Sequence, residues 1–269
     1  MDLLGEDVID EASSAWGDSF IVNFGLPPSP IESSVFGSAS PTGASLINWH
    51  VDGDFFVHFL DSPEQALLAI PIFSDIAPGG GATYIAPDGL APVARYLAAH
   101  PEGVVPHGCA FVPSTSPTLI PGSKLDPSTD PEYRCQIVET AKCTHFVELT
   151  GSIGDVVLLH PLMPHSASPN LLRVPRVITN PRVSLRTPFC FDRANPTDYS
   201  LVERTTLRAL GVDRLAFAPT SPRRTITPAR VGIQAKMIEE EKRRLEAARQ
   251  KRAEGVDLAA TVIPSIEVV

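Results

Sequence analysis

The sequence predicts a mainly β fold, in which short strands build a sandwich or barrel and a few helices flank it. Proline is abundant, at 27 of 269 residues spread through the chain, and this favours many short elements and turns over a helix bundle. Helical patterns appear only at 91–99 and after residue 200. Runs rich in apolar and β-branched residues recur at 19–24, 45–52, 55–60, 66–73, 82–87, 143–149, 156–160 and 177–185.

We expect the chain to be organised in segments around one β domain. Residues 1–18 are acidic and predict a poorly ordered start, and residues 19–192 hold the strand-like runs. A Pro/Ser/Gly-rich insertion at 105–133 is longer than the loops of most compact domains. A helical extension is predicted for 193–256, with a capping box at Ser200 and Glu203 and a stop at Gly211, before a tail at 257–269.

Composition narrows the classes of partner. The net charge of −9 disfavours nucleic acid and anionic membranes as partners. The acidic start lacks the pattern of a secretory signal, and no apolar run approaches the ~18 residues that span a bilayer. The four cysteines form no C-x-x-C pair, so we expect free thiols and a cytoplasmic protein, although one disulfide between Cys135 and Cys143 remains an alternative.

His50 and Asp52 form the first part of a candidate metal site. Side chains alternate along a strand, so these two project from the same side with Cα atoms ~6.5–7 Å apart. His165, at the end of the apolar run that begins at 156, is the candidate third ligand. Two histidines and one carboxylate leave coordination positions open, as in non-haem Fe(II) sites that use oxygen. The alternative for His165 is a hydrogen-bonded histidine of the core or rim.

The other histidines fit ordinary roles better. His58 and His160 are expected to be satisfied core residues. His160 lies five positions before His165, so in one straight strand the two side chains face opposite sides and do not share a metal ion.

Several motifs together resemble the phytanoyl-CoA dioxygenase-like branch of the Fe(II)/2-oxoglutarate-dependent oxygenases, whose fold is also called clavaminate synthase-like. They cover residues 43–191 and are His50-Val51-Asp52, the stretch 79–87, Gly154-Asp155, His165 and Asn170, and Arg176. In that family an Asn follows the distal His by five positions and an Arg by eleven, as here. The resemblance implies a double-stranded β-helix core, a jelly roll of cupin-like type, in residues 19–192.

The resemblance also implies roles for individual residues. His50, Asp52 and His165 would bind Fe(II), and Arg176 would pair with the far carboxylate of 2-oxoglutarate, with Arg173 and Arg182 as alternatives. Thr83 and Ser166 are candidate hydroxyl donors to the co-substrate, and Ser168 is the alternative to Ser166. The implied reaction uses O2, with ascorbate as a possible accessory reductant, to hydroxylate or otherwise oxidise a small organic substrate while releasing succinate and CO2.

Two departures from the family pattern keep other functions open. Only about 50 residues precede His50, where family members carry a longer region that lines the substrate pocket, and position 167 is Ala where members often have a hydroxyl residue. The alternatives are a non-catalytic β-barrel protein that binds a ligand or partner, and a cupin-type metal enzyme without 2-oxoglutarate. Neither the substrate nor the oligomeric state follows from the sequence.

Overall fold

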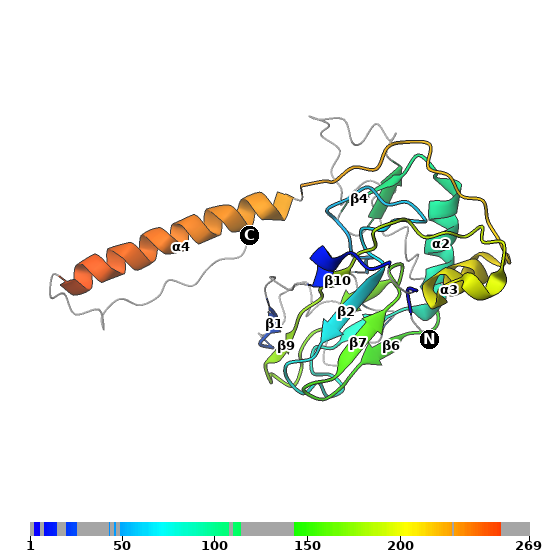
Figure 1. Ribbon diagram of the computed structural model, residues 1–269. Helices are drawn as coiled ribbons and strands as arrows, with labels where there is room; N and C mark the ends of the chain where they lie inside the picture. Colours follow the sequence, from blue (N-terminus) through cyan, green and yellow to red (C-terminus); the bar gives the residue numbers. More distant parts are fainter. Residues whose placement is uncertain are drawn as a thin grey trace. The chain divides into compact units, whose positions relative to one another are not determined.

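The computed structural model describes residues 3–5, 8–14, 20–25, 43, 46, 49–107, 110–113, 143–227 and 229–253. The fold is mainly β with a few helices, which confirms the class expected from the sequence (Figure 1). The chain divides into two compact units, Met1–Ile226 and Thr227–Val269. This boundary falls inside the segment 193–256, which we had expected to form one extension. The predicted tail at 257–269 lies outside the described residues.

All strands within the described ranges belong to the first unit and join into antiparallel sheets. They are β1 (Ile21–Asn23), β2 (Leu67–Pro71), β3 (Thr83–Ile85), β4 (Val104–His107), β5 (Ala110–Pro113), β6 (Val147–Leu149), β7 (Val156–Leu159), β8 (His165–Ala167), β9 (Arg176–Ile178) and β10 (Arg182–Val183).

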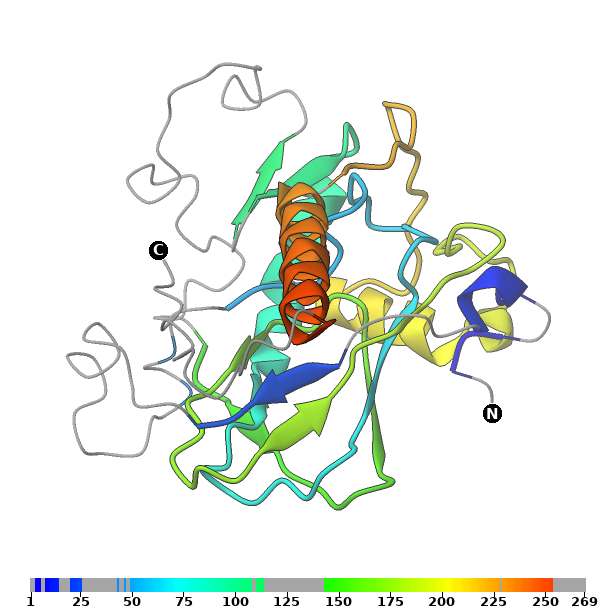
Figure 2. The ribbon, with the colours of Figure 1, turned by 90° about the vertical axis from the view of Figure 1, so that its left-hand side faces the viewer.

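One group of strands is built around β2. Strand β2 pairs with β10 on one side and with β7 on the other, and β1 pairs with β9. An isolated bridge between Ile72 and Ile178 places β9 beside the residue that follows β2. Because β10 pairs with β2 itself, β9 and β10 both lie along the segment formed by β2 and Ile72. The predicted strand 177–185 is split near Pro181, which cannot donate a ladder hydrogen bond. The resulting order is β1, then β9 with β10, then β2, then β7, and Figure 2 shows β1 beside β9.

A second group is built around β3, which pairs with β6 and β8. His50 forms an isolated bridge to His165 at the start of β8, with backbone hydrogen bonds of 2.9 Å in both directions. The run 55–60 forms isolated bridges at Phe56 and His58 in place of a continuous strand. Strands β4 and β5 form a separate hairpin. The start of the expected insertion 105–133 therefore belongs to this hairpin, and residues 114–142 lie outside the described part.

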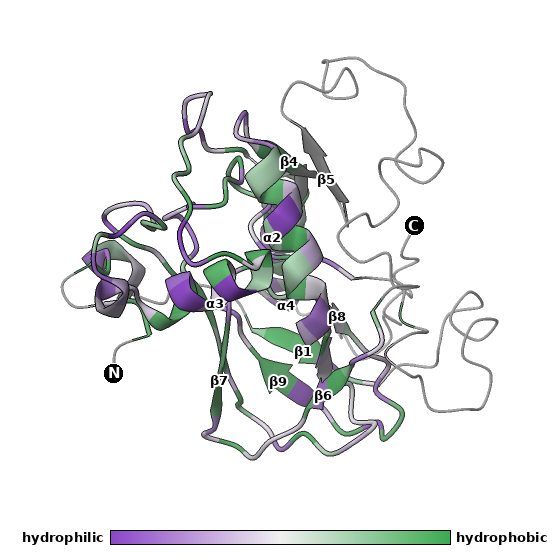
Figure 3. Ribbon diagram, turned by 90° about the vertical axis from the view of Figure 1, so that its right-hand side faces the viewer, coloured by the Kyte–Doolittle hydropathy of each residue, from purple (hydrophilic) through white to green (hydrophobic). Residues whose placement is uncertain are grey.

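The two groups of strands face each other across an apolar core. Buried side chains of β2, β7 and β9 form a cluster against which partly buried side chains of β3 and β6 pack. The strands carry apolar residues for such a core, and Figure 3 shows β7 and β9 coloured largely as hydrophobic. The members of this cluster from the first group are Leu68, Ile70, Ile72, Leu159 and Ile178, and Ile85 and Leu149 join them from the second.

Helices cover the other side of the second group. α2 (Leu90–Ala99) buries Leu90, Val93, Ala94 and Leu97, a spacing that places them on one helical face. They share a larger core cluster with Trp49 and with residues of α3 (Leu201–Leu210), and Tyr84 of β3 packs against it. Among the residues that the structure describes, this unit also has the 3-10 helices η1 (Glu11–Ser14), η3 (Pro87–Gly89) and η6 (Pro196–Asp198).

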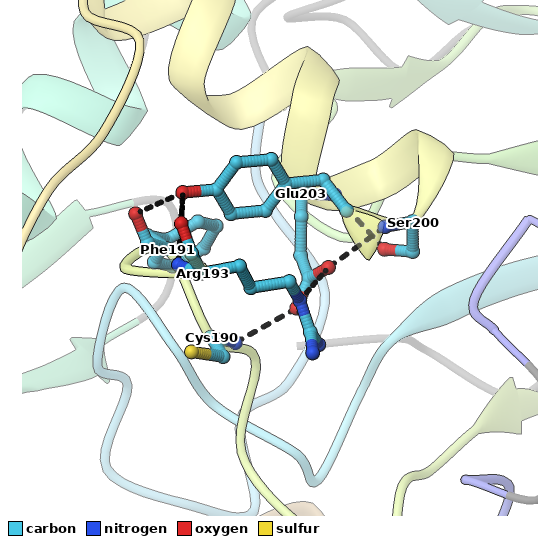
Figure 4. A network of polar contacts seen from close by, with 6 residues as sticks. Cys190, Phe191, Arg193, Ser200 and Glu203 are labelled. Atoms are coloured by element: carbon cyan, nitrogen blue, oxygen red, sulfur yellow. Dashed lines mark hydrogen bonds and ion pairs between the residues drawn. The ribbon is translucent and has the colours of Figure 1, made fainter. Parts of the chain in front are cut away.

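Hydrogen bonds of the Glu203 side chain connect α3 to the segment that follows β10 (Figure 4). Glu203 forms the predicted capping box with Ser200, and Gly211 ends the helix in the left-handed conformation, as the sequence indicated. The buried carboxylate of Glu203 also accepts hydrogen bonds from the backbone of Cys190 at 2.8 Å and from the guanidinium of Arg193 at 2.7 and 3.1 Å. Since every contact satisfies a buried oxygen, the network is structural.

The second unit contains α4 (Ala229–Ala253), and its described side chains are exposed along most of the helix. The charged side chains of this helix that the structure describes are therefore solvated. Within the described residues, no helix is both long and apolar enough to cross a membrane.

Candidate metal centre

The structure brings together the three side chains that the sequence proposed as metal ligands. One ligand atom from each of His50, Asp52 and His165 lies within 4.8 Å of the other two. The bridge between His50 and His165 explains the convergence, because directly opposite residues of an antiparallel pair project from the same face. The two imidazole rings accordingly lie 4.4 Å apart between centroids.

Asp52 lies between the two histidines. Its Oδ1 is 3.4 Å from Nε2 of His50, and its Oδ2 is 3.5 Å from Nε2 of His165. Ligands in neighbouring positions around one ion, with bonds of about 2.1 Å, lie roughly 3.0–3.4 Å apart. The contacts of Asp52 with each histidine are therefore close to this spacing, and the ligand atoms of all three residues lie within 4.8 Å of one another.

The electrostatics of the centre favour an ionised carboxylate. Burial opposes ionisation of Asp52, but its contacts with His165 and His50 outweigh burial and hold the pKa of Asp52 well below its usual range. An anionic oxygen beside two imidazoles is the donor set that a divalent cation requires.

His165 is oriented for ligation by its own hydrogen bond. Its Nδ1 lies 3.0 Å from the carbonyl oxygen of Met163. A carbonyl only accepts, so Nδ1 carries a proton, and Nε2, on the side of Asp52, is the nitrogen that would bind a metal ion. The same second contact fixes the tautomer of metal-binding histidines in general.

The centre is closed on one side and open on the other. The side chain of His165 is 8% exposed and that of Asp52 is 19% exposed, whereas that of His50 is 29% exposed. A small molecule would therefore approach from the side of His50.

Polar side chains that the sequence reasoning missed hold Asp52 and the residue after it. Asn180 Nδ2 donates to Oδ2 of Asp52 at 2.9 Å, and Gln65 Nε2 donates to the backbone oxygen of Asp52 at 3.2 Å. His58 Nε2 lies 2.7 Å from the carbonyl oxygen of Gly53. Asn180 is 128 positions from Asp52 and follows no local pattern, so the sequence contained no signal that could have identified it.

Arg176 faces the interior between the two groups of strands. Arg176 and Ile178 are buried while Val177 between them is only partly buried, so strand alternation puts Arg176 on the face of Ile178, a member of the inter-sheet core. His165 is opposite Ile85, which packs against the same core. Arg176 and His165 therefore point from opposing groups of strands toward one interior.

The guanidinium of Arg176 is short of hydrogen-bond partners there. The residue is 3% exposed, and its Nε and Nη1 meet no acceptor among the described residues. Burial lowers the pKa of Arg176 below its ordinary value. Since buried donors of a cation that lack acceptors are costly, an anion would complete this position.

The two hydroxyl candidates lie on different faces. Thr83 is two positions before Ile85 in β3, so it shares the face of Ile85 and His165. Ser166 is opposite Tyr84, on the helix-covered face, and its hydroxyl donates to the carbonyl oxygen of Ala167 at 3.2 Å. Ser168, the alternative, lies two positions after Ser166 and therefore on the same face. Its hydroxyl donates to the carbonyl oxygen of Ala82 at 2.8 Å. Only Thr83 therefore shares the face of the metal ligands.

The alternative arginines are not buried. Arg173 is exposed at a positive φ of 56°, and Arg182 is exposed with its guanidinium 3.8 Å from the ring centroid of Phe55. Asn170, five positions after His165, has a structural role: its Nδ2 donates to the backbone oxygens of Asn23 at 3.0 Å and Val174 at 2.6 Å.

His58 and His160 are hydrogen-bonded, as expected for core histidines. His58 stacks on Phe56 with parallel rings 4.2 Å apart. Burial lowers the pKa of each to about 4, and hydrogen bonds to the carbonyl oxygens of Gly53 and Val202 only partly offset this. Both are therefore neutral at pH 7.

Comparison with protein families, with curated proteins and with solved structures finds no match to this chain. Its function has to be derived from the geometry of the centre.

Proposed function

We propose that this chain is an Fe(II)- and 2-oxoglutarate-dependent dioxygenase that hydroxylates or otherwise oxidises a small organic substrate. One observation carries the proposal: one ligand atom from each of His50, Asp52 and His165 lies within 4.8 Å of the other two. Arg176 supports it as a buried guanidinium on the core-facing side of β9, without acceptors for two of its nitrogens among the described residues. The proposal takes the three ligands as partners of a cation and Arg176 as the partner of an acid.

The strand order supports a jelly-roll, or double-stranded β-helix, core. Along the chain, successive segments alternate between the two groups: β1 in the first, His50 in the second, β2 in the first, and β3 in the second. The chain continues with β6 in the second group, β7 in the first, β8 in the second and β9 with β10 in the first. Apart from β3 and β6, which both lie in the second group, consecutive segments of this series switch groups. This order is typical of a jelly roll, in which two Greek keys build two facing sheets.

The donor set supports Fe(II). Two imidazoles and one carboxylate on one face leave neighbouring positions open, which is typical of non-haem iron enzymes that use oxygen. A catalytic zinc site also takes histidine and carboxylate ligands, so the choice of iron depends on Arg176.

Arg176 supports 2-oxoglutarate as the co-substrate. A guanidinium offers a planar fork of donors that matches a carboxylate, and pairing in a buried position would compensate its desolvation. Thr83, on the same face as His165, would add a hydroxyl donor. A metal enzyme that does not use a 2-oxo acid would have no evident reason to bury this cation.

The residues of the chain have separate tasks in the proposed reaction. With Fe(II) and 2-oxoglutarate bound, the centre would support oxidative decarboxylation by O2, yielding succinate, CO2 and an oxidised substrate. His165 keeps its proton on Nδ1 against Met163 and presents Nε2, while Asp52 supplies the negative charge. The apolar core beside them excludes water. The free thiols of Cys143 and Cys190 support a reducing compartment such as the cytoplasm.

Succinate release tests the proposal. The full chain, supplied with Fe(II), 2-oxoglutarate and O2, is expected to form succinate slowly even without a substrate. His165→Ala should abolish this, whereas His145→Ala, which truncates an exposed histidine, should not. A folded, iron-loaded protein that forms no succinate would exclude this function and favour a binding protein. Turnover without 2-oxoglutarate would favour a cupin-type enzyme.

A further inference from the structure

Asn180 contacts the carboxylate of the candidate metal centre directly. It lies between β9 and β10, where the strand is interrupted before Pro181, and its side-chain amide reaches Oδ2 of Asp52 at 2.9 Å. An amide N–H only donates, so this contact occupies one of the two lone pairs of Oδ2, whose other neighbour is Nε2 of His165 at 3.5 Å. Oδ1 lies on the side of His50.

The backbone around Asp52 is held independently of Asn180. Gln65 donates to the backbone oxygen of Asp52, and it also lies 3.5 Å from the carbonyl oxygen of Pro161. His58 holds the carbonyl of Gly53, whose φ of 118° turns the chain away from the centre. The remaining freedom of Asp52 is rotation of its carboxylate. Among the contacts of the described residues with its oxygens, that of Asn180 is the shortest, at 2.9 Å against 3.4 Å for His50 and 3.5 Å for His165.

We propose that Asn180 is a positioning residue that reserves Oδ2 of Asp52, so that Asp52 binds the metal ion through Oδ1 alone. The inference depends on the proposed metal centre and adds to it a residue that acts through a ligand. A carboxylate that used both oxygens would occupy one more coordination position. By preventing this, Asn180 keeps a position available for the small molecules of the reaction.

The proposal predicts that metal affinity and coordination number change when Asn180 is replaced. Partners of ligating groups commonly change metal affinity by about 10–100-fold when removed. In Asn180→Leu, which has similar volume but no donor, the carboxylate is free to rotate and to bind through both oxygens. We expect weaker binding in that range and a changed coordination number.

Titration of the full chain with Co(II) tests this, with visible absorption reporting the number of ligands. Wild-type protein should bind Co(II) in a manner that depends on His50 and His165, and Asn180→Leu should bind more weakly with an altered spectrum. Asn180→Gln, which keeps an amide donor, should restore part of both. Asn195→Leu, which removes an exposed asparagine from the N-cap of η6, should change neither.

The outcomes separate the two proposals. If the wild-type chain does not bind Co(II) through its histidines, the metal centre and the role of Asn180 both fail. If it binds, but Asn180→Leu has the same affinity and spectrum, only the role of Asn180 is overturned. Should Asn180→Leu fail to fold, Asn180→Ala is the replacement, and the same spectral change is expected of it.

Discussion

Arg176 places a positive charge in the core with two of its nitrogens unmatched by described acceptors. Such a residue does not stabilise the fold by itself, because desolvation of an unpaired charge costs more than packing returns. An anionic ligand that accepts hydrogen bonds from these nitrogens would explain why Arg176 is buried. Stability and ligand binding are therefore expected to respond in opposite directions when it is replaced.

Replacing Arg176 with Met should leave the unfolding free energy unchanged or raise it by up to about 3 kcal/mol, because an apolar side chain replaces an uncompensated charge. Thermal melting with and without 2-oxoglutarate measures this. At 100 times its dissociation constant the ligand should stabilise the wild type by about 2.7 kcal/mol and should not stabilise Arg176→Met.

Arg182→Met is the matched comparison for Arg176→Met, because Arg182 was the alternative candidate for the same role. It should keep the stabilisation by 2-oxoglutarate. Loss of that stabilisation in Arg182→Met, with Arg176→Met unaffected, would reverse the assignment.

Gly53 is a second residue whose replacement has a calculable effect. At its φ of 118° an added Cβ would lie 2.6 Å from Nε2 of His58 and 2.6 Å from Cε1 of Phe56. Gly53→Ala should cost about 1–3 kcal/mol of unfolding free energy and weaken Co(II) binding, because the carbonyl held by His58 would shift next to Asp52. Chemical denaturation and metal titration measure the two effects.

Gly79→Ala is the control for Gly53→Ala. Gly79 also has a positive φ, of 74°, but nothing lies within 4 Å of an added Cβ. It should lose only about 1 kcal/mol and bind metal normally. Equal metal affinity in Gly53→Ala and Gly79→Ala would contradict a link between the turn and the centre.

At the scale of elements, His160 joins the end of β7 to α3. Its Nδ1 accepts from the backbone of Leu162 at 3.1 Å, so Nε2 carries the proton and donates to Thr206 at 3.1 Å. Burial lowers the pKa of His160 to about 4, from 6.5, because the desolvated ring disfavours the charged form, and the hydrogen bond to the carbonyl oxygen of Val202 offsets this only in part. The folded contact therefore requires the neutral ring.

This contact predicts acid sensitivity. Stability from His160 is fully present above pH 6.5 and is lost as the pH falls toward 4, because the unfolded chain binds the proton first. The loss amounts to at most about 3 kcal/mol. Denaturation between pH 7 and 4 should show a shallower decline for His160→Gln than for the wild type, and identical slopes would refute the link.

His58 affects the pH dependence of stability in the same direction, so its contribution has to be distinguished from that of His160. Its pKa is also lowered to about 4 by burial. A residual slope is therefore expected in His160→Gln, and it should shrink further when His58→Gln is added.

At the scale of the whole molecule, the candidate centre belongs entirely to the first unit. The ligands, Arg176 and Asn180 all precede the boundary at Ile226, and α4 belongs to the second unit. A chain that ends at Ile226 should therefore fold, melt within a few degrees of the full chain and bind Co(II) with the same affinity. Calorimetry and metal titration measure these properties, and loss of binding on truncation would mean that the second unit contributes to the centre.

The candidate site was partly predictable because some of its signals are local. His50 and Asp52 lie two positions apart in an extended segment, so alternation alone predicts that they converge. His165 required the family spacing, because nothing local distinguishes a ligand from a rim histidine. Ser166 was proposed as a substitute for the hydroxyl residue that the family often has at position 167, but adjacent residues of a strand face opposite sides, and Ser166 lies opposite Tyr84.

The β class, the capping box at Ser200 and the stop at Gly211 were determined by the sequence alone, because each depends on residues close together in the chain. The tertiary structure decided which side chains share the interior with His165, and it brought Asn180 to Asp52 across 128 positions. Contacts of that kind depend on the register of strands that meet only in the folded chain, and no short-range pattern encodes that register.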